Sequence, residues 1–187
     1  MIIHPAHRRW DLATQHRAFL GGLGLLDRAP ALTSDVLLAL HEMLLPPTNP
    51  HRGRFRTGPT KVWWNGVGRE KPDPATALAL TQQTLQRINL EIRAGLSGAV
   101  AKSSAARAHL DITDAHPFGD GNGRVARSVA AWILWRGGYA LLMDPGLHCH
   151  QRNGEYYRAV ASHCVDPRPW ERFFDQLVER CFREVAA

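Results

Sequence analysis

The residues best suited to chemistry lie within twelve consecutive positions, 116 to 127. They read His-Pro-Phe-Gly-Asp-Gly-Asn-Gly-Arg, and Arg127 follows after two further residues. A histidine with the ordinary pKa of ~6.5 is largely neutral at physiological pH and can accept a proton. The stretch thus combines a base, a carboxylate, a glycine-rich turn and two cations, a set suited to transferring a phosphorus group.

The same stretch predicts how these groups are positioned. Pro117 disfavours helical geometry for the residue before it, so His116 should end a helix and project from a loop. The apolar spacing of the residues that follow predicts a helix with one buried face. A glycine-rich turn that enters a helix is an anion site, because unpaired N–H groups and the positive end of the helix dipole point outward. We therefore expect the backbone of Gly121, Asn122 and Gly123 to bind phosphate.

Charged side chains flank this turn. Arg124 and Arg127 are three residues apart, so they share one face of the predicted helix near its start and would meet the bound phosphates. Asp120 stands just before the turn, where a carboxylate would repel phosphate unless a divalent cation lies between them. Magnesium takes one or two protein carboxylates together with phosphate oxygens. We therefore expect Asp120 to hold Mg²⁺.

This segment resembles the signature of the Fic family (Fic/Doc, fido fold). That signature runs His-Pro-Phe, a variable residue, Asp or Glu, Gly-Asn-Gly-Arg, two variable residues and Arg, and every fixed position is filled here. The resemblance implies a nucleotidyltransferase, a protein adenylyltransferase that moves AMP from Mg-ATP to a Ser, Thr or Tyr hydroxyl of a target protein (AMPylation).

The resemblance also implies a role for each matched residue. His116 would be the general base, Asp120 the magnesium ligand, and Phe118 the anchor of the loop in the core. The anion hole would be formed by Gly121, Asn122 and Gly123, and the outer phosphates would be bound by Arg124 and Arg127. UMP or GMP transfer by the same site stays open, as does phosphotransfer, although the intact Gly-Asn-Gly run argues against the latter.

The length of 187 residues suits one domain with a sizeable core. The resemblance covers residues 32–187, preceded by an extension at 1–31. No apolar run has the length of a signal peptide or a membrane span, and the three cysteines are sparse and odd in number. We therefore expect a cytoplasmic bacterial protein without disulfides; delivery into another cell stays open.

The chain reads as a series of helices separated by proline and glycine residues, so the predicted structure is mainly helical. We expect helices over 34–45, from Asp73 onward, over 98–115, and from the motif to Gly137. Two last helices would be capped by Asn153 and Asp166, the second extending to Phe182. Between residues 53 and 68 the pattern predicts a β-hairpin whose turn is residues 57–60. The expected fold is the helical Fic (fido) fold with a small hairpin.

In the resembling family this hairpin is the flap, which aligns the target segment by adding it as a strand beside the active site. Strand addition draws affinity from main-chain hydrogen bonds. A plain exposed hairpin is the alternative. The residues expected to form the docking edge are Arg54, Phe55, Arg56, Thr57, Lys61 and Val62.

A second resembling segment starts at Asn153 and carries Tyr156 and Tyr157, which the family places near the nucleobase. Core packing is the alternative for either tyrosine. A family member that binds adenine through an asparagine further on would place it at Cys164, a poor substitute, so the identity of the base stays open.

Two competing signals carry less weight. Histidines and cysteines at 148–150 and 163–164 suggest zinc, but adjacent ligands do not follow the usual paired spacing. The formal charge of +6 suggests nucleic-acid binding, but the basic residues are scattered without a recognisable signature. A phosphate-rich substrate and an acidic target surface explain the charge better.

Many members of the resembling family are silenced by a glutamate that pairs with the second motif arginine, here Arg127. The family's inhibitory pattern, Ser or Thr four residues before Glu and then Gly or Asn, has no match in this sequence. The glutamate would then come from a small separate antitoxin, our first expectation for a bacterial toxin. An unrestrained, secreted effector is the second.

Overall fold

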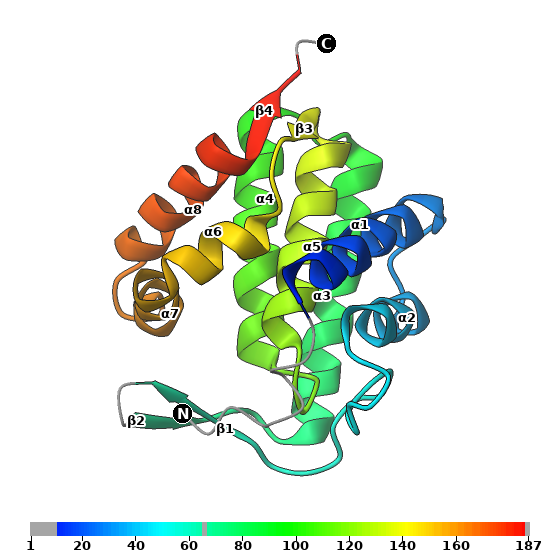
Figure 1. Ribbon diagram of the computed structural model, residues 1–187, viewed down its shortest axis with the longest axis vertical. Coiled ribbons are helices and arrows are strands. Elements are labelled where there is room, and N and C mark those ends of the chain that lie inside the picture. The colour runs from blue at the N-terminus through cyan, green and yellow to red at the C-terminus, as the bar shows by residue number, and fades with distance from the viewer. Residues whose placement is uncertain (1–10, 65–66, 186–187) are drawn as a thin grey trace.

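The computed structural model describes residues 11–64 and 67–185, and over these residues the fold is mainly helical with two small antiparallel sheets. Two long helices, α4 and α5, form the centre, with α1 and α2 on one side and α6 to α8 on the other (Figure 1). None of the described helices is long and apolar enough to span a bilayer. The helices are α1 (Leu12–Arg28), α2 (Ser34–Leu44), α3 (Pro74–Ala94), α4 (Gly98–Ala115), α5 (Asn122–Arg136), α6 (Pro145–Gln151), α7 (Asn153–Ser162) and α8 (Arg168–Cys181). The strands are β1 (Lys61–Trp64), β2 (Val67–Glu70), β3 (Tyr139–Leu141) and β4 (Phe182–Glu184).

The central helices α4 and α5 pack closely because small residues line their contact. Ala101, Ala105 and Ala108 recur along one face of α4 and are fully buried. At the far end of the contact α5 stops at Gly137, where a Cβ would lie 2.1 Å from the Cβ of Ala101. Only glycine fits there, so Gly137 permits the close approach of the two helices.

The helix expected from Asp73 and the one expected over 98–115 are confirmed. Asp73 caps α3 by accepting hydrogen bonds from two backbone N–H groups, and Pro74 occupies the first helical position. Both features are typical of helix starts. The motif helix also ends at the expected glycine, Gly137.

The hairpin is present, but the turn predicted at residues 57–60 is wrong. The strands are β1 and β2, which pair from Lys61 with Glu70 to Trp64 with Val67. The two intervening residues lie outside the described chain; in sequence they are Asn-Gly, the strongest short hairpin signal, which outweighs Gly-Pro at 58–59. Residues 54–57 therefore belong to the loop before β1, where the backbone N–H of Arg56 donates to Pro117 O at 2.9 Å.

Two elements near the limits of the described chain were not predicted from the sequence. Helix α1, within the stretch predicted as an extension, buries Phe19 and Leu26 against the common core. At the other end the last helix stops at Cys181. Phe182 begins β4, which pairs with β3, so its predicted place in the last helix is wrong. Short strands of three residues leave too little alternation to be seen in sequence.

Three histidines of the described chain are buried, and two of them, His41 and His109, have almost no exposed surface. His41 of α2 is fully buried and His109 of α4 is 1% exposed. Burial lowers the pKa of His41 to about 4 and the pKa of His109 to about 3, because the charged imidazolium loses its water. Both side chains are therefore neutral in the folded protein at any pH above 5.

We expect acid to destabilise the fold before carboxylates titrate. Unfolded histidines take up protons near pH ~6.5, whereas folded His41 and His109 do not, so the free energy of unfolding falls as the pH drops from 6.5 toward 4. The expected slope is about 1.4 kcal/mol per pH unit for each histidine. Urea unfolding between pH 7.5 and 5 measures it.

The His109→Gln variant should have a flatter profile than wild type, and the exposed His150→Gln variant should not. Identical slopes in wild type and His109→Gln would contradict this account of the buried histidine.

Candidate active site

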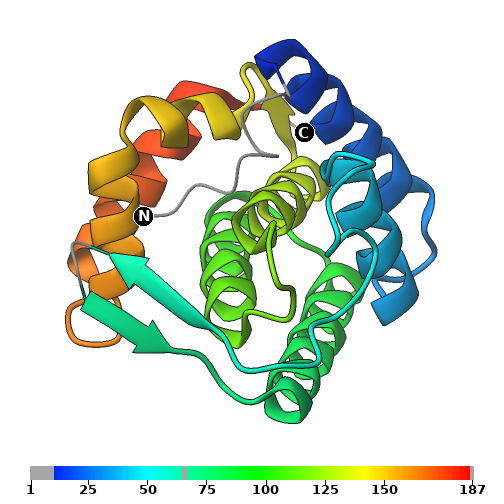
Figure 2. The same cartoon turned by 60° about the horizontal axis from the view of Figure 1, so that its bottom comes forward.

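The motif residues line one cleft of about 390 Å³. The N-terminal end of α5 contributes Gly121, Asn122, Gly123, Arg124 and Arg127, and the loop before it contributes His116 and Asp120. The other walls come from β1, through Lys61 and Val62, and from α7, through Tyr156 and Tyr157. Figures 1 and 2 show the hairpin at the end of the molecule where α4 ends and α5 begins. Four of the expected flap residues, Arg54, Phe55, Arg56 and Thr57, are not among the residues lining this cleft.

His116 ends α4 in a left-handed conformation, with φ 51° and ψ 56°. It is the one non-glycine residue with positive φ in the described chain. Its Nδ1 lies 3.1 Å from Thr113 O. A carbonyl oxygen only accepts, so Nδ1 carries the hydrogen, and a neutral ring then has a lone pair on Nε2. The histidine is prepared to accept a proton at Nε2.

The surroundings of His116 keep it neutral. Burial lowers the pKa of His116 to about 4, and the positive charges of Lys71 and Arg56 act in the same direction. Arg56 also holds the backbone, because its Nε donates to His116 O at 2.7 Å and the rest of its guanidinium binds the carbonyls of Gly58 and Pro72. The guanidinium expected on the docking edge thus fastens the catalytic loop to the base of the hairpin.

The loop between His116 and α5 is closed by one side chain. Asn122 Oδ1 accepts from the backbone N–H of Phe118 at 3.0 Å, and its Nδ2 donates to Phe118 O at 2.9 Å. Phe118 itself is fully buried, as the resemblance implied. The helix's own hydrogen bonds begin with the N–H groups of Arg124 and Val125, both to Gly121 O. The N–H groups of Asn122 and Gly123 precede them, at the position from which a helix start binds anions.

His41 holds the loop from α2, a contact that was not predicted from the sequence. Its Nδ1 accepts from the backbone N–H of Gly53 at 3.1 Å, so its Nε2 carries the hydrogen and donates to Asp120 O at 2.9 Å. The ring also stacks on Phe118 with centroids 3.8 Å apart. In sequence His41 is one of several polar residues in a mainly apolar helix, and no local pattern indicates its contact with Asp120.

The carboxylate of Asp120 is oriented by two donors. Asn49 Nδ2 and Arg124 Nη2 each donate to Asp120 Oδ2 at 2.9 Å. Asn49 was not predicted, because its burial and its contact with Asp120 are visible only in the structure. An oriented carboxylate in the same cleft as an anion-binding helix start matches the donor set that Mg²⁺ prefers, a carboxylate with substrate phosphates. The residues present therefore fit a magnesium ion.

Two glycines of the loop are in close contact with neighbouring side chains. Gly121 has φ 83°, and a Cβ there would lie 2.6 Å from Leu45 Cδ1. At Gly119, the variable position of the signature, a Cβ would lie 2.5 Å from Nδ1 of His51. Gly121 needs glycine for its backbone conformation. At Gly119 a side chain fits only if the exposed ring of His51 moves.

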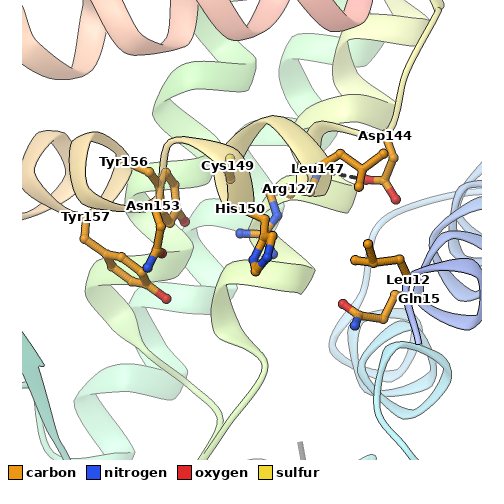
Figure 3. A pocket seen from close by; sticks show the side chains of 11 residues that line it. Leu12, Gln15, Arg127, Asp144, Leu147, Cys149, His150, Asn153, Tyr156 and Tyr157 are labelled. Atoms are coloured by element: carbon orange, nitrogen blue, oxygen red, sulfur yellow. Dashed lines mark hydrogen bonds between the residues drawn. The ribbon is translucent and has the colours of Figure 1, made fainter. Parts of the chain in front are cut away.

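Arg127 separates the cleft from a second cavity of about 180 Å³. This cavity lies between α1, which supplies Leu12 and Gln15, and the segment from Asp144 to Tyr157 (Figure 3). The guanidinium stands 5.8 Å from the ring centroid of Tyr156. Tyr156 is 4% exposed and hydrogen-bonds through its hydroxyl to His109 Nε2 at 3.2 Å. Tyr156 thus packs in the core and also lines both cavities.

Comparison with known proteins agrees with this geometry. A model of the Fic/DOC family matches residues 31–134. Protein adenylyltransferase Fic of Drosophila yakuba is 31% identical over 150 residues, which are 80% of this chain and 28% of that protein. The chain thus spans less than a third of the length of this relative.

Solved structures share the fold. A Fic family protein from Desulfovibrio desulfuricans G20 superposes with a TM-score of 0.68 at 21% identity, covering 88% of this chain and 50% of that chain. The BepC protein of Bartonella tribocorum, crystallised with bound AMPPNP, gives a TM-score of 0.66 at 14% identity, covering 92% and 86%. The family model spans more than half of the 187 residues and includes the whole loop from His116 to Arg127. This chain belongs to the Fic/DOC family.

Proposed function

We propose that this protein is an AMPylation enzyme, transferring AMP from Mg-ATP to a hydroxyl side chain of a target protein. The observation that carries the proposal is the cleft in which a neutral histidine with a lone pair on Nε2 faces the same space as a helix start and two arginines. The AMPPNP bound to BepC supports a nucleoside triphosphate as the donor.

The proposed reaction is a single displacement. His116 Nε2 takes the proton of the target hydroxyl while its oxygen forms a bond to the α-phosphorus of ATP. The bond from that phosphorus to the bridging oxygen breaks, and pyrophosphate leaves with the electron pair. His116 gives its proton to solvent afterwards, so no covalent enzyme intermediate is needed.

The chain's own groups stabilise the charge that moves to the phosphates. The first N–H groups of α5 and the guanidinium groups of Arg124 and Arg127 are positioned before ATP arrives, so little reorganisation is needed. A magnesium ion held by Asp120 would neutralise phosphate charge when bound. His41, Asn49 and Arg56 act by positioning, through Asp120 O, Asp120 Oδ2 and His116 O respectively.

The hairpin is the proposed docking edge. Within the described chain β1 pairs with β2 alone, so each strand has one edge open to a further strand. Lys61 and Val62 of β1 line the catalytic cleft, which sets a strand added there beside His116. Arg54, Phe55 and Thr57 would contribute to docking of the target only through the loop before β1, in which they lie. A variant of IbpAFic2, of the same fold, has been crystallised with adenylylated Cdc42, which supports a protein as the acceptor.

Tyr156 and Tyr157 would contact the nucleobase and so select adenine. Transfer of UMP or GMP is the alternative.

We also propose a bacterial toxin role in which a small antitoxin supplies a glutamate near Arg127. The support is that this guanidinium lines both cavities, where an added carboxylate can reach it. A secreted effector is the alternative role.

We expect His116→Ala to abolish labelling of a target. Purified protein, bacterial lysate, Mg²⁺ and each of four α-³²P nucleoside triphosphates are incubated and separated on a denaturing gel. A general base contributes about 10²–10⁴ in rate, so the band should fall below detection. The variant's unfolding curve serves as the control for folding. Undiminished labelling by His116→Ala would refute the proposal, and the nucleotide that labels best identifies the donor.

The activity should depend on pH differently from that of an enzyme whose catalytic histidine has an ordinary pKa. Because burial lowers the pKa of His116 to about 4, the active neutral base persists well below pH 6.5. We expect kcat/KM at saturating Mg²⁺ to stay flat from pH 7.5 to 5.5 and to fall only as the pH approaches 4. A loss of activity centred near pH ~6.5, the unperturbed value, would mean that the base is solvated.

Loss of Asp120 and of Arg127 should have unequal effects. Asp120→Ala removes the carboxylate assigned to magnesium and should abolish Mg²⁺-dependent transfer. Arg127→Ala should mainly raise KM for ATP, because Arg124 and the first N–H groups of α5 still hold phosphate. Steady-state kinetics over a magnesium series separate the two, and an equal total loss in both variants would show that the roles are misassigned.

A further inference from the structure

A group of metal-ligand side chains contacts two residues that line the cleft, Lys71 and Val160. Among the residues that the structure describes, one such group brings its ligand atoms within 4.8 Å of one another: Asp114, His163 and Cys164. Asp114 lies in the last turn of α4, two residues before His116, and the other two directly follow α7. His163 Nε2 is 2.7 Å from Asp114 Oδ2 and 3.3 Å from Cys164 Sγ. His163 and Cys164 belong to the zinc signal considered in the sequence, whereas the residues at 148–150 lie on α6 and are not part of this group.

The orientation of His163 points to a ligand for its second nitrogen. Nδ1 lies 2.7 Å from Val160 O, so Nδ1 carries a hydrogen and donates it. Metal-binding histidines commonly fix their ring in this way, through a hydrogen bond from the other nitrogen to a carbonyl. The imidazole is 11% exposed, and its Nε2 faces a carboxylate and a sulfur together. A single N–H on Nε2 cannot point at both, whereas one cation can bind all three atoms.

We propose that Asp114, His163 and Cys164 bind a zinc ion, with water as the fourth ligand. Zinc is the common partner of mixed thiolate, imidazole and carboxylate sets. Around zinc such atoms stand roughly 3.3–3.6 Å apart. Sγ and Nε2, at 3.3 Å, already have this spacing, and Oδ2, at 2.7 Å from Nε2, must move slightly away from that nitrogen. Lys71 Nζ contacts the other oxygen of Asp114, Oδ1, at 3.4 Å, and so leaves Oδ2 for the metal.

The consequence is a link between two walls of the active site. α7 carries Tyr156 and Tyr157, and the end of α4 carries His116. A zinc ion bound by Asp114 and by the two residues after α7 would join these two elements without taking part in the reaction. The inference does not depend on the proposed reaction, because its test uses metal binding alone.

The test is a zinc titration of chelator-stripped protein without nucleotide, against a chromophoric zinc indicator. We expect one Zn²⁺ per chain, and Cys164→Ser or His163→Ala should weaken binding by more than the ~10–100-fold typical of losing an outer partner. Asp166→Asn and His150→Ala remove a nearby carboxylate and an exposed imidazole and should bind as wild type does. Wild-type affinity in Cys164→Ser, or equal weakening in the controls, would overturn the proposal.

Two further readouts do not require His163→Ala to fold. Cobalt bound in place of zinc should give a sulfur-to-metal charge-transfer band that Cys164→Ser abolishes. Zinc should also slow alkylation of Cys164, which is exposed while Cys149 and Cys181 are buried. Absence of the band together with unprotected alkylation at saturating zinc would refute the site.

Discussion

Two hydrogen bonds between the side chain of Asn122 and the backbone of Phe118 close the loop that joins α4 to α5. Because both backbone groups and the amide are buried, breaking either bond would leave a polar group without water. The loop therefore has one low-energy shape. That shape turns the first N–H groups of α5 toward the cleft and sets His116 at the end of α4, so the anion site and the base share a single support.

Other elements hold the same loop from outside. His41 binds the carbonyl of Asp120 from α2, and Arg56 binds the carbonyl of His116 from the loop before the hairpin. Each uses a side chain to satisfy a backbone group that the tight loop cannot pair internally. Two separate segments thus hold the backbone of this loop, one at Asp120 and one at His116.

The sequence predicts the central part of this arrangement well and its supports poorly. Pro117, the glycines and the helix period are local signals, and they located the end of α4 and the start of α5 correctly. His41, Asn49 and Arg56 act through contacts with residues more than fifty positions away, which no local pattern encodes. The hairpin turn was misplaced because Gly-Pro and Asn-Gly are both turn signals, and the pairing of β1 with β2 decided between them. The roles of the flap and the nucleobase pocket stay predictions, since only bound partners test them.

The contact between Gly119 and His51 has a consequence for how the sequence can change. A signature leaves position 119 unspecified, yet any side chain there would meet the ring of His51 within 3 Å. The two positions therefore form a compensating pair. A larger residue at 119 becomes acceptable in this chain once position 51 is small or its ring turns away, so substitutions at the variable position cannot be transferred from relatives one residue at a time.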